Sequence, residues 1–248
     1  MARLALISDI HGNGVALDAV LADIAAREVD EIVCLGDIAA GGPQPSQVVR
    51  RLRKLGCRAV RGNADGWLLE SLPPGRSEAT RRLSDIVAWA RTQVGDADLA
   101  YLAALPATER CSVGGLELLC VHGSPRSDLE PLLATTHDDA LDEVLAAAGA
   151  RVLAAGHTHL QLLRQHGDSV LVNPGSVGLP LATMTESPPL PASAEYALAT
   201  VNDGEVEISF RRLPIDVDAL RAASALMPHA SWASDLEQRI RRWNARPR

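Results

Sequence analysis

The chain has 248 residues, of which 47% are hydrophobic, and its formal net charge at pH 7 is −7. This length is enough for one large domain with a substantial core, and the acidic balance disfavours general nucleic-acid binding, which depends on basic side chains. No stretch is long and apolar enough to span a bilayer, and the four cysteines show no CxxC spacing, so we expect a reduced, cytoplasmic protein without a membrane partner.

The first quarter of the chain alternates apolar runs with amphipathic stretches. The predicted strands cover residues 4–7, 31–35 and 57–60, and the predicted helices cover residues 15–27 and 46–55. We expect Ser46 to cap the second helix and Gly56 to end it. Strands and helices that alternate in this way predict a parallel sheet with right-handed crossovers.

The alternation of strands and helices stops at residues 66–105. Here the sequence predicts a helical insertion, with one helix near 77–94 and a second that ends at Leu105. The insertion is either a lid over the carboxyl edge of the sheet or a packing element on one of its faces. From Thr108 the pattern is typical of antiparallel strands, with hairpin turns at Gly114-Gly115 and His166-Gly167-Asp168. A helix near 138–148 and a strand at 151–155 lie between these hairpins.

The last part of the chain predicts a mobile loop at 179–194, a hairpin at 196–212 and a helical tail from Asp216. We find no internal repeat and no domain linker. The expected organisation is therefore a single domain over residues 1–248, with a C-terminal helical extension at about 214–248.

Polar side chains with metal-binding chemistry follow five of the predicted strands. They are Asp9, His11, Asp37, Asn63, His122, His157 and His159. Parallel neighbours place their carboxyl ends at one edge of a sheet, where open α/β sheets bind ligands. Any single one of these residues is equally well explained as a satisfied structural side chain or a helix cap, but the recurrence at strand ends favours a common site.

The donor set is too large for a single tetrahedral ion. Carboxylate, carboxamide and imidazole donors without thiolate suit two divalent ions, with Mn as the first choice and Fe, Zn, Ni or Co as alternatives. Paired ions of this kind are usual in hydrolases that act on phosphate esters.

The order of these motifs resembles the calcineurin-like metallophosphoesterase superfamily. The motifs are Asp9-Ile10-His11, Gly36-Asp37, Gly62-Asn63-Ala64-Asp65, His122 and Gly156-His157-Thr158-His159. The run Asn173-Pro174-Gly175-Ser176 also resembles the small bacterial and archaeal branch that includes the YfcE-like phosphodiesterases. The resemblance implies an α/β fold: a four-layer α/β/β/α sandwich of two mixed sheets.

The resemblance further implies a role for each motif residue. One ion would be held by Asp9, His11 and His159, and the second by Asn63, His122 and His157, with Asp37 as the bridge between them. Asn63, Asp37 and His122 are the implied catalytic residues. The implied reaction is hydrolysis of a small phosphate ester, and of phosphodiesters in particular, by a metal-bridging hydroxide.

Ala64 departs from the family pattern, which commonly has a histidine at this place. We therefore expect activity to favour phosphodiesters or good leaving groups over alkyl phosphomonoesters. The alternatives are a phosphomonoesterase or protein phosphatase, a nuclease, or a binding scaffold with weak or no catalysis. Asn13 and Arg126 are further candidates for phosphate contact, Asp65 is expected to be structural or to orient a ligand, and a homo-oligomer is compatible with the sequence.

Overall fold

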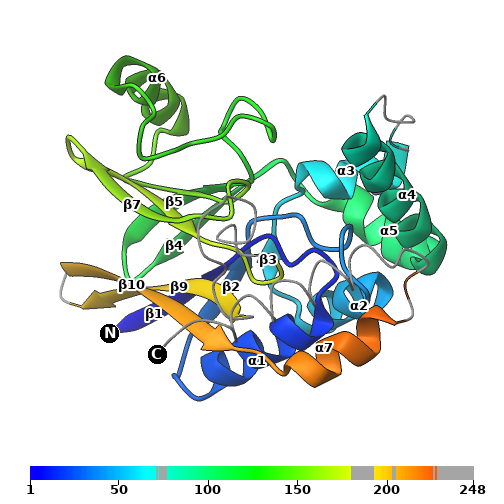
Figure 1. Cartoon of the computed structure of the whole chain (residues 1–248). Coiled ribbons are helices and arrows are strands. Elements are labelled where there is room, and N and C mark those ends of the chain that lie inside the picture. The colour runs from blue at the N-terminus through cyan, green and yellow to red at the C-terminus, as the bar shows by residue number, and fades with distance from the viewer. Residues whose placement is uncertain (71, 73–76, 180–192, 203–204, 226, 228–248) are drawn as a thin grey trace, which may run out of the picture.

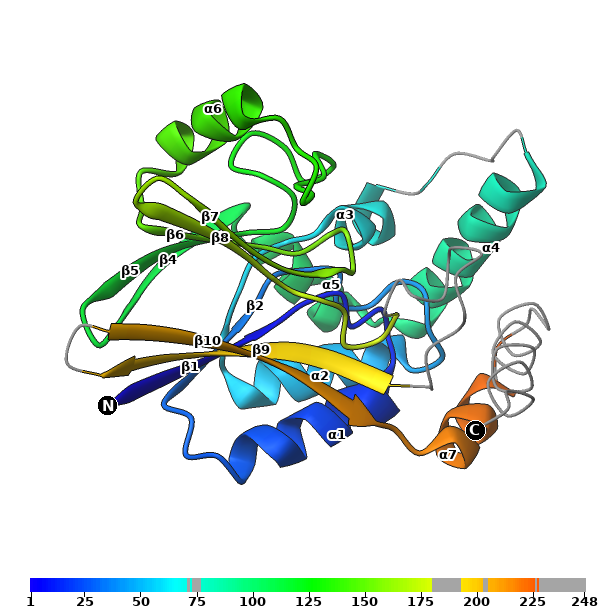
Figure 2. The same ribbon diagram turned by 60° about the vertical axis from the view of Figure 1, so that its left-hand side comes forward.

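The computed structural model of the chain describes residues 1–70, 72, 77–179, 193–202, 205–225 and 227 (Figure 1). Its ten strands form two five-stranded sheets that face each other, with helices on the two outer faces (Figures 1 and 2). This is the four-layer arrangement that the motifs predict. Among the described residues no helix combines the length and the apolar character needed to cross a membrane.

Sheet A has the strand order β10-β9-β1-β2-β3. Its strands are β1 (Ala2–Ile7), β2 (Glu31–Cys34), β3 (Arg58–Ala59), β9 (Ser193–Asn202) and β10 (Glu205–Pro214). The predicted parallel order of β1, β2 and β3 is confirmed, although β3 is only two residues long. The antiparallel hairpin of β9 and β10 extends this sheet beside β1.

Sheet B has the strand order β4-β5-β6-β8-β7. Its strands are β4 (Thr108–Val113), β5 (Leu116–Val121), β6 (Val152–Ala155), β7 (Gln161–His166) and β8 (Ser169–Pro174). The two predicted hairpins are confirmed, but the predicted change to an antiparallel pattern is wrong for the centre of the sheet, where β5, β6 and β8 are parallel. The reason is α6 (Asp138–Ala148), which carries the chain from β5 back to the start of a parallel β6.

Helices α1 (Gly14–Ala25) and α2 (Pro45–Leu55) pack on the outer face of sheet A. Asn13 caps α1. The prediction that Ser46 caps α2 is wrong, because Pro45 occupies the first helical position, where its missing N–H costs nothing, and Ser46 lies inside the helix. Gly56 ends α2 as predicted, in a left-handed conformation with φ of 66°.

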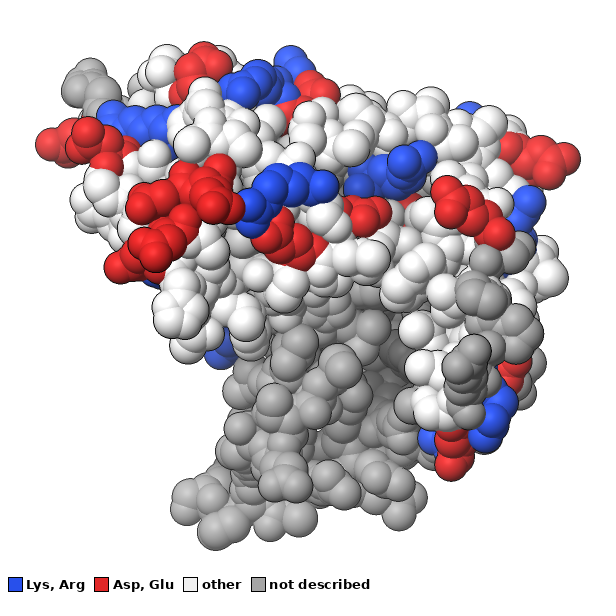
Figure 3. Space-filling view, turned by 90° about the horizontal axis from the view of Figure 1, so that it is seen from above, with Lys and Arg blue, Asp and Glu red and all other residues white. Residues whose placement is uncertain are grey.

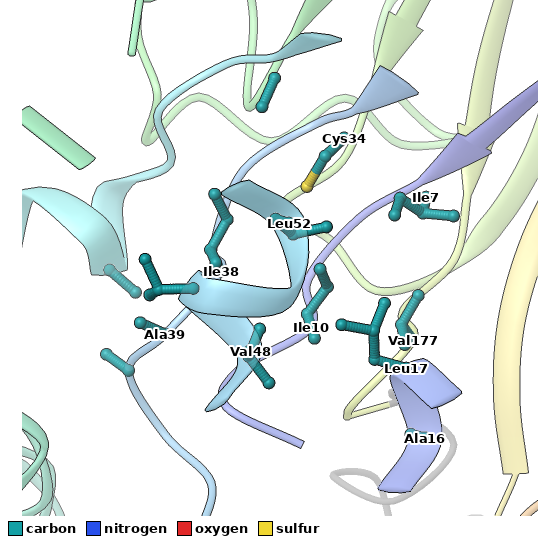
Figure 4. Packing of buried hydrophobic residues seen from close by; sticks show 14 of the residues in the cluster. Ile7, Ile10, Ala16, Leu17, Cys34, Ile38, Ala39, Val48, Leu52 and Val177 are labelled. Carbon is teal, nitrogen blue, oxygen red and sulfur yellow. The ribbon is translucent and has the colours of Figure 1, made fainter. Parts of the chain in front are cut away.

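The core is apolar on both faces of the central strands. Along β1, Leu4 and Leu6 point into the cluster between the two sheets, while Ala5 and Ile7 belong to the cluster under the helices. Figure 4 shows this second cluster, where side chains from β1, α1 and α2 meet. Each fully buried aliphatic side chain contributes about 1.5–3 kcal/mol, so the strands are held firmly at the point where their carboxyl ends emerge.

The helical insertion consists of α3 (Asn63–Glu70), α4 (Glu78–Gln93) and α5 (Asp96–Ala104). It begins three residues earlier than predicted, so that Asn63 is itself the first residue of a helix. Buried side chains of all three helices, among them Leu68, Val87 and Leu102, join the cluster on the outer side of sheet A, which favours a packing element over a lid.

A short helix, α7 (Val217–Ser224), follows β10 and opens the predicted C-terminal extension. Residues 180–192 of the predicted loop and residues 228–248 of the predicted tail lie outside the described residues.

Candidate metal centre

Five of the seven residues predicted from the strand ends form two compact groups at the carboxyl edges of the two sheets, and Asn63 and His157 lie beside His122. Among the described residues, two groups of three have ligand atoms that all lie within 4.8 Å of one another. They are Asp9, His11 and His159, and Asp9, Asp37 and His122. His11 and His159 are 148 positions apart in the chain, so the fold assembles the site from distant segments.

The first group is a tight cluster of two imidazoles and a carboxylate. His11 Nε2 lies 3.1 Å from His159 Nε2, and Asp9 Oδ1 lies 3.3 Å from the same nitrogen of His159. Asp9 Oδ1 is 3.8 Å from His11 Nε2. All three side chains are largely shielded from solvent.

The second group shares Asp9 with the first, and its Asp37 lies close to members of both groups. Asp37 Oδ2 lies 3.6 Å from His11 Nε2 and 3.4 Å from His122 Nε2, so this carboxylate faces both groups. Asn63 Oδ1 lies 3.0 Å from His122 Nε2 on the other side.

His157 is less closely engaged than the other predicted ligands. Its ring packs edge-on against that of His122 with a centroid distance of 5.2 Å, and its backbone N–H donates to Asp9 Oδ2 at 3.1 Å. It belongs to neither of the two compact groups among the described residues.

The backbone is strained where these side chains converge. Six non-glycine residues among those described have positive φ, and five of them are predicted ligands: Asp9, His11, Asp37, His157 and His159. Left-handed conformations cost a non-glycine residue on the order of 1–3 kcal/mol and cluster at functional sites. The sharp turns aim consecutive polar side chains back toward one point.

Backbone carbonyls fix the orientation of three histidine rings. The Nδ1 atoms of His11 and His122 each lie 2.7 Å from a carbonyl oxygen, that of Ala40 and that of Leu35 respectively. His159 Nδ1 donates in the same way to Leu179 O. A carbonyl only accepts, so each Nδ1 carries the hydrogen, and each Nε2 presents a lone pair to the centre unless it is protonated.

The donor set fits divalent cations. The lone pairs of His11 and His159 meet within 3.1 Å, and Asp9 Oδ1 beside them is fully buried without a hydrogen-bond donor in good geometry. Electron pairs packed in this way repel one another unless a proton or a cation lies among them. Imidazole and carboxylate donors without thiolate match ions such as Mn²⁺ and its neighbours in the first transition row.

The electrostatics of the metal-free site follow from the same contacts. Burial alone would raise the pKa of the Asp9 carboxyl, but His159 beside it holds this pKa below its usual range. Burial alone would also raise the pKa of Asp37, but the charge and hydrogen bond of His122 outweigh the effect of burial and lower this pKa. The pKa of His122 rises to about 10 because Asp37, and Asp9 behind it, outweigh the effect of burial.

Asp65 ties the two neighbouring loops together, as expected of a structural residue. Its carboxylate accepts hydrogen bonds from the backbone N–H groups of Ile38 at 2.8 Å, Ala39 at 3.3 Å and Gly62 at 3.1 Å. Burial and the nearby charge of Asp37 raise the pKa of Asp65 to about 7. The residue thereby fixes the loop of Asp37 against the start of α3.

Two glycines allow the strand ends to approach. A Cβ atom on Gly62 would lie 2.2 Å from Asp37 Oδ1, and one on Gly156 would lie 2.0 Å from Ser8 Oγ. Both distances are far shorter than real contacts, so any side chain at either position would push the ligand loops apart.

Three residues named from the sequence have other partners. Arg126 forms ion pairs with Glu130 and Glu143, and the side chain of Asn13 caps α1 and donates to Gly178 O at 3.2 Å. Both side chains therefore have partners within the fold. Ala64 is buried among apolar side chains, and its backbone N–H donates to Asp37 Oδ1 at 2.8 Å.

Comparison with known proteins gives the family. The calcineurin-like phosphoesterase superfamily domain matches residues 2–204, so the chain belongs to this superfamily. The resemblance predicted from the motifs is thus confirmed.

Individual relatives agree with this assignment. The chain is 28% identical over 222 residues to the uncharacterized protein MJ0912 of Methanocaldococcus jannaschii. The aligned region covers 83% of this chain and 85% of that protein. It is 27% identical over 190 residues to the phosphodiesterase YfcE of Escherichia coli K12, covering 73% of this chain and 82% of YfcE. A metallophosphoesterase from Sphaerobacter thermophilus has a similar structure, with a TM-score of 0.74 and 27% identity over 95% of this chain and 98% of that one. Family and relatives together support a phosphoesterase that hydrolyses phosphate esters, and the family implies divalent metals.

Proposed function

We propose that the protein is a dinuclear metal-dependent phosphodiesterase that acts on a small phosphate ester. The observation that carries this proposal is the pair of adjoining ligand groups, in which buried lone pairs face one another and Asp37 faces both groups. A single ion would leave part of this donor set without a cation.

The proposed assignment of ligands follows the family motifs. Asp9, His11 and His159 would hold one ion, Asn63, His122 and His157 would hold the other, and Asp37 would contact both. When bound, such ions lower the pKa of a bound water and neutralise negative charge on the reacting phosphate.

The chain itself supplies positioning and electrostatics. Asn63 offers an amide N–H group to a phosphate oxygen in addition to its own oxygen, and as the first residue of α3 it lies at the positive end of the helix dipole. The carbonyls of Ala40, Leu35 and Leu179 keep the histidine rings from turning, so the electron pairs remain directed at the centre.

Position 64 supports the preference for diesters. Ala64 has no group that could protonate a leaving alcohol, and its side chain is buried in the core. Hydrolysis would then depend on substrates with good leaving groups. An acidic chain also favours small substrates over polyanions. In Figure 3 the basic side chains of the described residues are scattered among acidic ones and form no basic patch on the visible face.

A substrate panel tests the proposal. The wild-type protein is assayed with bis(p-nitrophenyl) phosphate, p-nitrophenyl phosphate and serine phosphate in the presence of Mn²⁺, Ni²⁺, Co²⁺, Zn²⁺ or Mg²⁺, and the metal content is measured as purified. We expect the diester to be turned over faster than serine phosphate with the same ion. Faster turnover of serine phosphate would contradict the diesterase assignment and favour a phosphomonoesterase.

A further inference from the structure

The segment at residues 173–179 contacts the ligand loops from outside the predicted ligand set. It leaves sheet B at the end of β8 and crosses the carboxyl end of β1 in sheet A. Asn173 Nδ2 donates to Gly156 O at 2.6 Å and to Thr158 Oγ1 at 3.1 Å, which holds the loop that carries His157 and His159. Asn173 is itself 1% exposed.

The centre of this segment forms hydrogen bonds with the backbone on both sides of the Asp9 Cα atom. Ser176 Oγ donates to Asp9 O at 2.7 Å, and Gly178 N donates to the same oxygen at 3.0 Å. Val177 N donates to Ser8 O at 2.9 Å. Three hydrogen bonds therefore fix the two peptide groups that hold Asp9 at its strained φ of 55°.

The end of the segment orients the ring of His159. Leu179 O accepts from His159 Nδ1, and Leu179 N in turn donates to Ser176 Oγ at 2.7 Å. The fully buried hydroxyl of Ser176 thus contacts the backbone of Asp9 directly and the ring of His159 indirectly, through Leu179.

The segment is itself anchored on both sides. Val177 is buried in the cluster that contains Ile10 and Leu17 (Figure 4), and Glu195 N of β9 donates to Ser176 O at 2.9 Å. Packing against the core and pairing with a sheet strand make it a rigid support.

These contacts are unevenly distributed over the site. Residues 176–179 contact Asp9 and His159, two of the three members of the group formed by Asp9, His11 and His159, whereas Asn173 contacts the loop shared by His157 and His159. The rings of His11 and His122 are held instead by Ala40 O and Leu35 O, and Asp37 by the N–H of Ala64.

We propose that residues 173–179 position the Asp9–His11–His159 group for a divalent cation, and that Ser176 is the central positioning residue. The inference rests on the proposed function, because it assumes that this group binds an ion. Loss of the Ser176 hydroxyl would remove one of the three hydrogen bonds that fix the peptide groups of Asp9 and also the partner of Leu179 N–H, so the group would be less well preorganised. Outer contacts of this kind typically change metal affinity by about 10–100-fold.

The test is a titration of the metal-free protein with Mn²⁺ by isothermal calorimetry. We expect Ser176→Ala to weaken one of two binding events by about 10-fold or more and the other by less than about 3-fold. The control is Ser224→Ala in α7, which removes another buried hydroxyl that donates to a backbone carbonyl at 2.7 Å, and it should leave both events unchanged. If Ser176→Ala does not fold, Ser176→Cys, which keeps the size and a weak donor, takes its place.

A double-variant comparison identifies the group that is affected. In a His11→Ala background, which already lacks a ligand of that group, Ser176→Ala should have no further effect on the remaining ion; in a His122→Ala background its full effect should persist. Equal weakening of both events, or an unchanged isotherm, would overturn the inference while leaving the proposed function intact. If the wild type binds no divalent ion, the proposed function fails and the inference with it.

Discussion

At the scale of single residues, the site is defined by backbone conformation as much as by side-chain chemistry. Asp9, His11 and Asp37 all have φ near 50°, a conformation that glycine adopts far more readily. A glycine at these positions would have no side chain to bind a metal ion. Aspartate and histidine therefore occupy them despite the cost of a positive φ, and glycines occur at neighbouring positions. Close packing at those glycines is what keeps the strained residues in place.

Gly62 provides the sharpest test of this packing. In Gly62→Ala the new methyl group would overlap Asp37 Oδ1 and Asp37 N, at 2.2 and 2.4 Å. Overpacking of this kind costs about 1–3 kcal/mol. We expect urea denaturation of the metal-free protein to show a loss of that size, together with weaker Mn²⁺ binding.

The matched control is Gly66→Ala in α3, the helix that directly follows Gly62, because a Cβ atom at Gly66 meets nothing within 4 Å. Alanine is the better helix former, so this variant should gain about 0.5–1 kcal/mol. Equal stability of the two variants would show that contact with Asp37 is unimportant.

At the scale of elements, Asp23 links α1 to the β9–β10 hairpin. Its carboxylate accepts hydrogen bonds from Arg27 at 2.8 Å and from the hydroxyl of the buried Tyr196, and it forms an ion pair with Arg211 at 3.4 Å. The hydrogen bonds from Arg27 and then Tyr196 outweigh partial burial and lower the pKa of Asp23 to about 2.

The sign of the pH dependence follows from that shift. An unfolded aspartate has a pKa of about 4. The folded value is lower, so charged Asp23 stabilises the fold above pH 4, and this contribution is lost as the pH falls from about 4 to about 2. Chemical denaturation at several pH values should therefore show that the stability advantage of the wild type over Asp23→Asn shrinks across this window.

Asp18→Asn on the same helix is the control, because the Asp18 side chain is half exposed and its contact with Arg51 is longer, at 3.4 Å. It should change stability little across the same pH values. A constant gap between the wild type and Asp23→Asn from pH 5 to pH 2 would rule out the assigned role of Asp23.

The sequence predicts strand ends better than strand order. An apolar run followed by Asp, Asn or His beside Gly is a local pattern, and it predicts the five residues of the two compact groups as well as Asn63 and His157, which lie beside His122. The parallel centre of sheet B was missed because a buried strand reads the same in either direction of pairing. Partners such as Leu35 O and Ala40 O leave no trace in the sequence, since every residue has a carbonyl.

At the scale of the whole molecule, the proposed ions would connect the two sheets. Asp9 and Asp37 follow strands of sheet A, and His122, His157 and His159 follow strands of sheet B. The apolar cluster between the sheets already joins them, which is why we propose that they form a single domain. Bound ions would add to that connection.

Metal binding should therefore stabilise the fold. At a free Mn²⁺ concentration of about 100 times the dissociation constant, one site adds about 2.7 kcal/mol. For a chain of this size each kcal/mol raises the midpoint of thermal unfolding by roughly 2–4 °C. We expect this rise on comparing Mn²⁺ with a chelator, and a smaller rise in His159→Ala; equal midpoints in Mn²⁺ and chelator would contradict metal binding.

The most direct measurement of the central claim is hydrolysis of bis(p-nitrophenyl) phosphate by the Mn²⁺-loaded wild type, by the chelator-treated wild type and by His122→Ala. His166→Ala serves as the control, because His166 lies at the end of β7 and pairs with Asp142 at 2.6 Å, away from the site. The proposed function predicts turnover by the loaded wild type and by His166→Ala, with loss of turnover on chelation and in His122→Ala. Undiminished turnover in His122→Ala, or none in the loaded wild type, would contradict it.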